Sequence, residues 1–167
     1  MRIIELHGKT GDSKIVLGES MEHLPGYCDI GNSVIITDAN VRKACGTKFP
    51  KGMEVIEIGT GEGNKTLETV QMLYSRLLEL GLDRSSTIIG IGGGIVCDIA
   101  GFAATTFMRG TKCGFVPTSL LAQVDASIGG KNGVNFKGYK NIIGTFRQPD
   151  FVLCDFELLV TLPEREL

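Results

Sequence analysis

The segment Ser86–Phe107 carries the strongest indication of ligand chemistry in this sequence. A short apolar run leads into three consecutive glycines, Gly92-Gly93-Gly94, and a helical pattern follows from about Ile95. Glycines permit a tight turn and let backbone N–H groups approach an anion, and the positive end of the helix dipole favours the same guest. A pyrophosphate fits these properties, although the spacing is not G-x-G-x-x-G. A tight strand-to-helix turn that only serves close packing is the alternative.

Two acidic residues could contact a ligand bound at this glycine turn. Asp98 lies one turn into the helix, where a carboxylate favours the helix dipole. Because it would repel a pyrophosphate, a functional Asp98 would have to face a ribose or an amide. Glu62 lies in a Gly-Glu-Gly-Asn-Lys segment at 61–65, after a predicted strand, and could accept hydrogen bonds from a ribose diol. The spacing alone does not decide between these roles and structural ones.

Residues 109–147 include six basic residues and one acidic residue, Asp125. In a chain of net charge −2, this local excess predicts an anionic ligand, with a solvated face of scattered lysines as the alternative. Lys131 follows two glycines, and Lys140 precedes Asn141 in a stretch with weak helix and strand patterns, so we expect both lysines on loops. Asp125 lies among apolar residues and is expected to be packed, with Lys131 or a ligand hydroxyl as its partner.

The elements that must position these residues follow from the hydrophobic pattern. Short β-branched runs alternate with helical patterns, which predicts βαβ units and an α/β, Rossmann-like fold. We expect a mostly parallel sheet with helices on both faces and a small β-hairpin at the N-terminus. The predicted strands cover residues 2–6, 14–17, 33–37, 54–58, 86–91, 112–116 and 151–154, and the clearest predicted helices cover 66–80 and about 95–107.

Length and composition exclude several classes of protein. The chain has 167 residues, 43% of them hydrophobic and 22% charged, as expected for one globular domain. A net charge of −2 argues against a general nucleic-acid binder, and no stretch resembles a membrane span. Glu5 falls where a signal peptide would be apolar, so a cytoplasmic location is expected. Five scattered cysteines and two distant histidines predict neither a disulfide framework nor a metal site.

The last residues predict the beginning of another element. Thr161-Leu162-Pro163-Glu164 has the pattern of a capping box with proline in the first turn, which predicts a new helix. We therefore expect residues 1–160 to form a dinucleotide-binding domain. Residues 161–167 are expected to begin a helical domain that has been removed, with a short terminal helix or a frayed tail as the alternative.

Taken together, these segments resemble the 3-dehydroquinate synthase family of sugar-phosphate cyclases over nearly the whole chain. The resemblance is carried by GGGIVCDIAGFAATTFMRG (92–110), VPTSLLAQVDASIGGKNGVN (116–135), GYKNIIGTFRQP (138–149) and TLPEREL (161–167). The earlier GEGNK (61–65) resembles the family's Gly-Glu-x-x-Lys ribose-binding segment. The resemblance implies a Rossmann-like domain that binds NAD, a C-terminal helical domain that is absent here, and an active site between the two.

The resemblance also implies a reaction. Such enzymes convert 3-deoxy-D-arabino-heptulosonate 7-phosphate, a phosphorylated sugar acid, to 3-dehydroquinate and phosphate in the shikimate pathway of aromatic amino acid biosynthesis. NAD transiently oxidises a substrate hydroxyl, phosphate is eliminated, and reduction and an intramolecular aldol closure follow. A divalent zinc or cobalt ion polarises the oxygen that is oxidised. A homodimer is also implied. The family's metal ligands fall beyond position 167, so this chain alone is expected to bind no metal and to be inactive.

Site residues can be transferred from the family by position. The implied cofactor contacts are Asp38, Asn40, Glu62, Lys65, Gly93, Gly94, Ile95, Asp98, Thr118, Ser119, Leu121, Lys131, Lys140, Leu158 and Thr161. The implied substrate contacts are Asp125, Lys131, Asn141 and Arg109, the last reaching a substrate phosphate in the partner subunit of a homodimer. Two positions depart from the family pattern. Cys97 stands where glycine is usual, and Ser119 replaces a common threonine.

Other functions remain open at this point. Another sugar-phosphate cyclase, such as a 2-deoxy-scyllo-inosose or 2-epi-valiolone synthase, would share the NAD-binding half. A metal-dependent polyol or glycerol-1-phosphate dehydrogenase has a similar glycine turn, but the segment VDASIGGKNGVN argues against it. A non-catalytic nucleotide-binding module belongs to a different class and would need no second domain.

Overall fold

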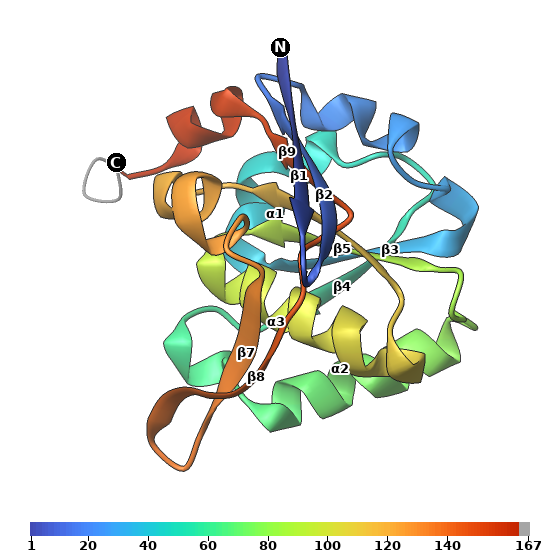
Figure 1. Ribbon diagram of the computed structural model, residues 1–167, viewed down its shortest axis with the longest axis vertical. Helices are drawn as coiled ribbons and strands as arrows, with labels where there is room; N and C mark the ends of the chain where they lie inside the picture. The colour runs from blue at the N-terminus through green and yellow to red at the C-terminus, as the bar shows by residue number, and fades with distance from the viewer. Residues whose placement is uncertain (164–167) are drawn as a thin grey trace.

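The computed structural model describes residues 1–163 and centres on a seven-stranded sheet with the order β1-β2-β9-β6-β5-β3-β4 (Figure 1). The strands are β1 (Arg2–Gly8), β2 (Gly11–Leu17), β3 (Ser33–Asp38), β4 (Glu54–Ile58), β5 (Thr87–Gly92), β6 (Lys112–Pro117) and β9 (Phe151–Cys154). β1 pairs antiparallel with β2, and the other pairs in this sheet are parallel. The predicted N-terminal hairpin and mostly parallel sheet are confirmed.

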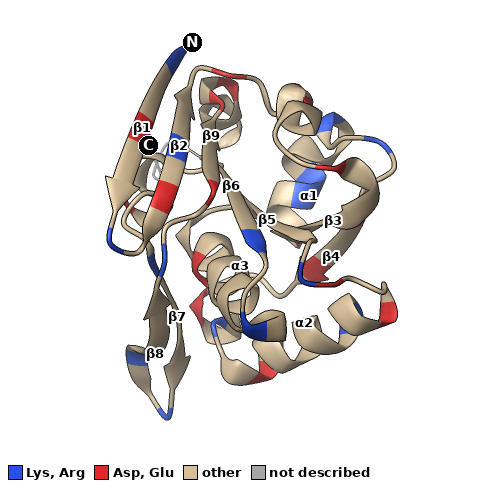
Figure 2. Cartoon of the chain, turned by 45° about the vertical axis from the view of Figure 1, so that its right-hand side comes forward, with Lys and Arg blue, Asp and Glu red and all other residues tan. Residues whose placement is uncertain are grey.

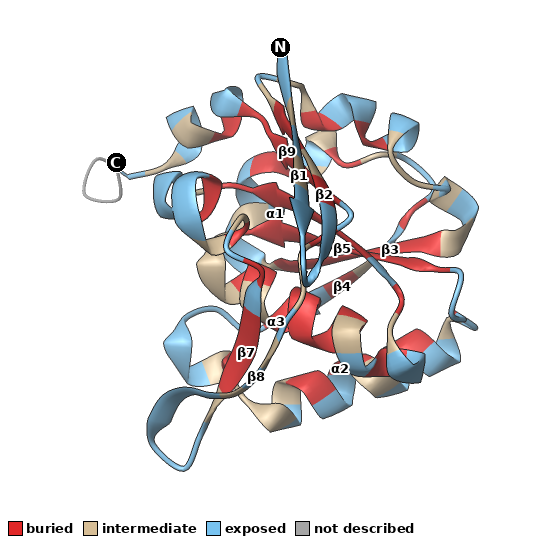
Figure 3. Ribbon diagram, in the orientation of Figure 1, coloured by how far each residue is buried: buried red, intermediate tan, exposed pale blue. Residues whose placement is uncertain are grey.

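Helices cover both faces of the sheet. They are α1 (Ala39–Cys45), α2 (Leu67–Glu79) and α3 (Gly94–Thr106). Strand β3 contributes to both sides because successive side chains in a strand point to opposite faces. Val34 and Ile36 join the core cluster formed with α2 and α3, whereas Ile35 joins the cluster that contains Cys45 of α1. The central strands are buried along their length, as Figure 3 shows, and β5 is buried at every position.

The limits of α2 follow from its sequence. The Thr66 hydroxyl accepts a hydrogen bond from Thr69 N at 3.3 Å and caps the first turn. Gly81 has φ 73°, a conformation that suits glycine, and it follows the last turn. Leu73 and Leu77 are fully buried against the sheet. The predicted helix at 66–80 is therefore confirmed to within a residue at each end.

A separate two-stranded hairpin, β7 (Lys131–Phe136) and β8 (Tyr139–Phe146), was not expected. The prediction that Lys131 and Lys140 lie on loops was wrong. The two-residue turn Lys137-Gly138 has positive φ at both positions, 48° and 83°, the backbone that joins strands of natural twist. Val134 is fully buried and anchors β7 on α3. In Figure 2, basic residues mark the tip and the strands of this hairpin.

Shorter helical turns link these elements. The 3-10 turns are Met21–Gly26, Ile30–Asn32, Gly46–Lys48, Glu62–Asn64, Phe107–Arg109 and Phe156–Thr161, and a π-helical turn spans Ala122–Ala126. Thr161 ends a 3-10 turn, and most of the helix predicted to begin there, like most of the predicted second domain, falls outside the described residues. Within residues 1–163, no helix is long and apolar enough to cross a bilayer.

Candidate functional site

The parallel strands β3, β5 and β6 end at the same edge of the sheet, where a pocket of about 420 Å³ opens. From β3 the chain continues to β4 on one side of the sheet, whereas from β5 it continues to β6 on the opposite side. The strand order therefore reverses between β3 and β5. Such a reversal is where open α/β sheets bind ligands. This sheet-edge pocket is lined by six of the implied cofactor contacts: Asp38, Asn40, Gly93, Thr118, Ser119 and Thr161.

The glycine turn faces this pocket. Gly93 is the N-cap of α3, and no side chain caps the first turn of this 13-residue helix. A Cβ added at Gly93 would meet only the Ser119 hydroxyl, at 3.5 Å, whereas one at Gly94 would come within 3.2 Å of the Ala126 Cβ. The protein therefore leaves open space in front of uncapped helical N–H groups. This cradle fits the pyrophosphate of a dinucleotide.

The other side of the pocket is formed where β3 meets α1. Asp38 Oδ1 accepts a hydrogen bond from Val41 N at 2.9 Å and caps α1, so Asp38 has a structural role in addition to any ligand contact. Asp38 also lines the pocket. Leu158, an implied cofactor contact, is fully buried in the core beside α1. Its side chain does not line the sheet-edge pocket.

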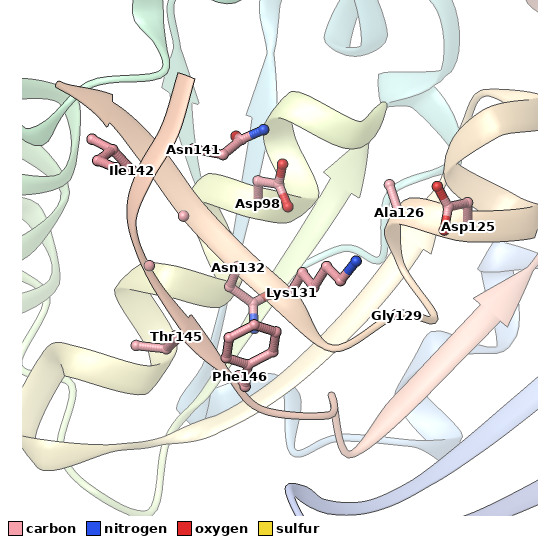
Figure 4. A pocket seen from close by; sticks show the side chains of 12 residues that line it. Asp98, Asp125, Ala126, Gly129, Lys131, Asn132, Asn141, Ile142, Thr145 and Phe146 are labelled. Atoms are coloured by element: carbon pink, nitrogen blue, oxygen red, sulfur yellow. The ribbon is translucent and has the colours of Figure 1, made fainter. Parts of the chain in front are cut away.

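A second pocket, of about 410 Å³, lies between α3, the π-helical turn and the β7–β8 hairpin (Figure 4). This hairpin pocket is lined by Asp98, Asp125, Lys131 and Asn141, together with Asn132 and Thr145. The structure thus brings together three of the implied substrate contacts and Asp98, from four different elements. Asn132 and Thr145 were missed because the hairpin was missed. The Lys-Gly turn at 137–138 was the pattern that could have revealed it.

Lys65 stands beside this pocket. Its side chain is 5% exposed, and its ammonium donates hydrogen bonds to the Asp98 carboxylate and, at 2.5 Å, to Asn141 Oδ1. The resemblance assigned Lys65 to the adenosine side of NAD, but the structure directs its ammonium to the hairpin-pocket residues. A buried ammonium needs such partners. Burial raises the pKa of Asp98, and the neighbouring Lys65 offsets that effect only in part.

Asp125 is exposed, so the expectation that it is packed was wrong. The π-helical turn buries Ala122 and Gln123 and directs the rest of the segment outward, with Val124 65% exposed. Gln123 Nε2 fixes the turn by donating to Pro117 O at 3.1 Å and to Asp155 O. Within the described chain, no ion pair joins Asp125 to Lys131. Figure 4 shows Lys131 extending toward the turn that carries Asp125.

The remaining implied contacts are scattered around the two pockets. Glu62 is exposed, and its Oε1 accepts a hydrogen bond from Asn135 Nδ2 at 2.8 Å. Lys140 and Leu121 are exposed and line neither pocket. Arg109 is exposed on the turn after α3, with φ 67°. The half-buried Ile95, in the first turn of α3, packs against the main core.

Cys97, which departs from the family pattern, is fully buried beneath the first turn of α3. Its thiol lies 3.8 Å from Gly92 O, on the side of the helix that packs against the sheet. Burial raises the pKa of this thiol well above its ordinary value. The substitution therefore fills core volume and leaves the glycine turn itself open.

A metal would need a cluster of suitable ligands. Within residues 1–163, no group of three or more His, Cys, Asp or Glu side chains comes together in a way that could bind one. The described residues therefore do not fit the divalent ion that the family resemblance implies.

Comparison with known proteins decides the family. A family model for the N-terminal part of 3-dehydroquinate synthase matches residues 55–167. The chain belongs to the 3-dehydroquinate synthase family. The 3-dehydroquinate synthase of Thermococcus kodakarensis is 54% identical over 135 residues, which cover 79% of this chain and 39% of the relative. That of Acetivibrio thermocellus is 53% identical over 144 residues, 82% of this chain and 40% of the relative. The chain thus spans about 40% of these family members.

Solved structures agree with this assignment. A 2-deoxy-scyllo-inosose synthase in complex with carbaglucose-6-phosphate, NAD⁺ and Co²⁺ matches with a TM-score of 0.87 and 28% identity, over 99% of this chain and 48% of that one. A 2-epi-5-epi-valiolone synthase from Streptomyces hygroscopicus with NAD⁺ and Zn²⁺ matches with a TM-score of 0.81 and 29% identity, over the same shares of the two chains. A probable glycerol dehydrogenase from Sinorhizobium meliloti, at 20% identity and a TM-score of 0.71, shares the fold alone.

Proposed function

We propose that this chain is the NAD-binding portion of a 3-dehydroquinate synthase, a lyase that converts 3-deoxy-D-arabino-heptulosonate 7-phosphate to 3-dehydroquinate and phosphate. The observation that carries the proposal is the open glycine turn at the carboxyl end of β5, which faces the sheet-edge pocket. Membership of the family and the NAD⁺ in two related structures support the choice of cofactor.

The sheet-edge pocket would hold the cofactor. The uncapped N–H groups at Gly93 and Gly94 would bind the pyrophosphate, because they lie at the positive end of α3. Asp38 and Asn40, at the end of β3, would contact the adenosine side, and Thr118 and Ser119 would form the opposite wall. Bound NAD would accept and return a hydride, which is the chemistry that the protein itself cannot supply.

The hairpin pocket would hold the phosphorylated sugar acid. Lys131 supplies a cation to an anionic substrate, and Asp125 and Asn141 supply hydrogen-bonding groups to its hydroxyls. Asp98, whose carboxylate contacts Lys65, would face the nicotinamide ribose or amide rather than the pyrophosphate. The linings support this assignment, since Lys131 and two carboxylates lie in the hairpin pocket, whereas the sheet-edge pocket contains the open glycine turn.

The complete enzyme is proposed to be a cytoplasmic homodimer that works in the shikimate pathway. Arg109 would reach a substrate phosphate bound by the partner subunit. Its exposure on the turn after α3 supports this role, because an exposed guanidinium is accessible to a partner subunit. In this proposal the 167-residue chain alone binds NAD without turnover, and the zinc or cobalt ligands are supplied from outside it.

Another sugar-phosphate cyclase is the second candidate, and the same two-pocket layout would serve it. The structural match to 2-deoxy-scyllo-inosose synthase favours it, with a TM-score of 0.87. Sequence identity favours 3-dehydroquinate synthase, with 54% to the Thermococcus enzyme against 28% to the inosose synthase.

Calorimetric titration of the folded chain with NAD tests the cofactor assignment, and Gly93→Ala is the informative variant. The added methyl group has room in the protein but occupies the proposed pyrophosphate cradle, so we expect NAD binding about tenfold or more weaker with nearly unchanged stability. Gly26→Ala is the control, because nothing lies within 4 Å of its Cβ position. If wild-type protein that is folded by circular dichroism fails to bind NAD, the proposal is wrong for this chain.

A further inference from the structure

Asn135, in β7, joins two segments that both carry proposed ligand contacts. Its side-chain Nδ2 donates a hydrogen bond to Glu62 Oε1 at 2.8 Å, and its Oδ1 accepts one from the Asn141 backbone N–H at 2.9 Å. A single amide thus uses its donor on one segment and its acceptor on another. Glu62 belongs to the proposed cofactor side and Asn141 to the proposed substrate side.

The backbone of Asn135 is held as firmly as its side chain. Its N–H donates to Lys65 O at 2.8 Å, and it forms an isolated parallel bridge with Thr66. These bonds attach β7 to the segment that leads from Glu62 into α2. The side chain therefore starts from a fixed point, which a long flexible residue on the surface would not provide.

The residue on the acceptor side needs such support. Asn141 has φ 54°, in the left-handed region that non-glycine residues adopt at a cost. This backbone turns its side chain toward Lys65, whose ammonium donates to Asn141 Oδ1 at 2.5 Å and also contacts Asp98. The hydrogen bond from Asn141 N–H to Asn135 stabilises that conformation. A continuous network then runs from Glu62 through Asn135, Asn141 and Lys65 to Asp98.

We propose that Asn135 is a positioning residue that fixes Glu62 for the cofactor ribose and Asn141 for the substrate, and so couples the two sites. The inference rests on the proposed function, because it takes Glu62 and Asn141 as ligand contacts. Asn135 itself lines neither pocket and would act only through these neighbours. A purely structural asparagine would affect stability without affecting NAD affinity.

Exchanging the hydrogen-bond donor and acceptor between positions 135 and 62 distinguishes a positioning role for Asn135 from a purely structural one. Asn135→Asp keeps the acceptor for Asn141 N–H but places a carboxylate oxygen against Glu62, so NAD affinity measured by calorimetry should fall about tenfold. Adding Glu62→Gln restores a hydrogen bond of reversed polarity, with glutamine as the donor. The double variant should bind NAD within about threefold of Glu62→Gln alone. Unchanged affinity in Asn135→Asp, or no rescue in the double variant, would overturn the proposal.

A second measurement needs no cofactor. Amide hydrogen exchange by NMR should show Asn141 N–H protected in the wild type and in Asn135→Asp, and exchanging about tenfold faster in Asn135→Leu, which keeps the side chain's size but has no acceptor. Equal exchange in all three proteins would mean that Asn135 does not hold Asn141. If the wild type binds no NAD while the exchange pattern is as expected, the proposed cofactor site fails and the positioning of Asn141 stands.

Discussion

The two pockets of this chain are formed by different kinds of chemical group. The sheet-edge pocket is formed by the ends of parallel strands and by the first turns of helices, and its key groups are backbone N–H groups, which the fold itself holds in place. The hairpin pocket is formed by side chains from α3, the π-helical turn, β7 and β8, held by hydrogen bonds between ionised and amide groups. The position of the sheet-edge pocket follows from the topology of the sheet, whereas the hairpin pocket depends on individual side chains.

This difference predicts how each pocket tolerates mutation. A backbone cradle survives any substitution that leaves the strands and helices intact, so only added bulk at the glycines should disturb it. A side-chain network fails when a single partner is removed, because a buried polar or charged group then loses its hydrogen bond. The three variants below test this contrast and are ordered by the size of the expected effect on stability.

Gly101→Ala should have the largest effect. A Cβ at Gly101 would lie 1.9 Å from Asn132 Oδ1 and 3.0 Å from Phe115 Cζ, so α3 would push β7 away. Asn132 Nδ2 would also lose its hydrogen bond to Arg147 O, which measures 3.0 Å. Overpacking and the lost bond outweigh the better helix propensity of alanine, and the free energy of unfolding should fall by about 3 kcal/mol. Urea denaturation measures it.

Amide hydrogen exchange shows which part of the protein Gly101→Ala destabilises. In Gly101→Ala, amides of the β7–β8 hairpin should lose protection from hydrogen exchange while those of β5 keep theirs. Gly26→Ala controls for adding a methyl group in open space and should change stability by less than about 0.5 kcal/mol. Equal loss of protection in β5 and the hairpin would show that the two pockets are not separable.

Lys65→Met should have the second largest effect on stability. Methionine keeps the apolar stem but removes the ammonium that contacts Asp98 and Asn141, in a site where the Lys65 side chain is 5% exposed. The free energy of unfolding should fall by about 2 kcal/mol, less than for a fully buried pair because the Asp98 side chain remains 20% exposed. Lys43→Met, on the exposed side of α1, is the matched control. A loss no larger than in the control would show that Asp98 and Asn141 do not depend on Lys65.

The regular part of the fold was predictable because its patterns are local. Ser33–Thr37 and Ser86–Ile91 are continuous apolar runs, and each lies within a residue of a strand in the structure. Thr66 and Gly81 marked the ends of α2 by capping and by a left-handed backbone. The glycine turn was also recognisable, since its chemistry lies in backbone groups whose position follows from the strand and the helix on either side.

The hairpin pocket was less predictable because its residues are brought together by tertiary contacts. β7 and β8 contain glycines and lysines that weaken the strand pattern, and Val134 is the one buried hydrophobic residue of β7, packed on α3. The exposure of Asp125 depends on a π-helical turn, which periodicity does not indicate. The partner of Lys65 lies 33 residues away, so no local rule places its ammonium against Asp98. The family resemblance named four residues that line this pocket, Asp98, Asp125, Lys131 and Asn141, but it did not indicate the contacts between them.

Asp98→Asn should have the smallest effect on stability and a clear effect on binding. Because burial raises the pKa of Asp98, the folded protein binds a proton at this carboxyl more strongly than the unfolded chain does. Wild-type stability therefore decreases as pH rises from the ordinary aspartate pKa through the raised one. The asparagine variant lacks this loss, so relative to wild type it should gain stability across that window and be at least as stable at pH 7.

Urea denaturation at several pH values between about 3 and 7 measures that difference, while calorimetry should show NAD affinity about tenfold weaker in Asp98→Asn. Such a result would mean that the ionised carboxylate is kept for binding although it does not favour folding, a known trade-off at functional sites. An asparagine variant that is less stable than wild type at pH 7 would show instead that attraction to Lys65 exceeds the effect of burial. Asp98 would then belong to the scaffold of the hairpin pocket, as Lys65 does.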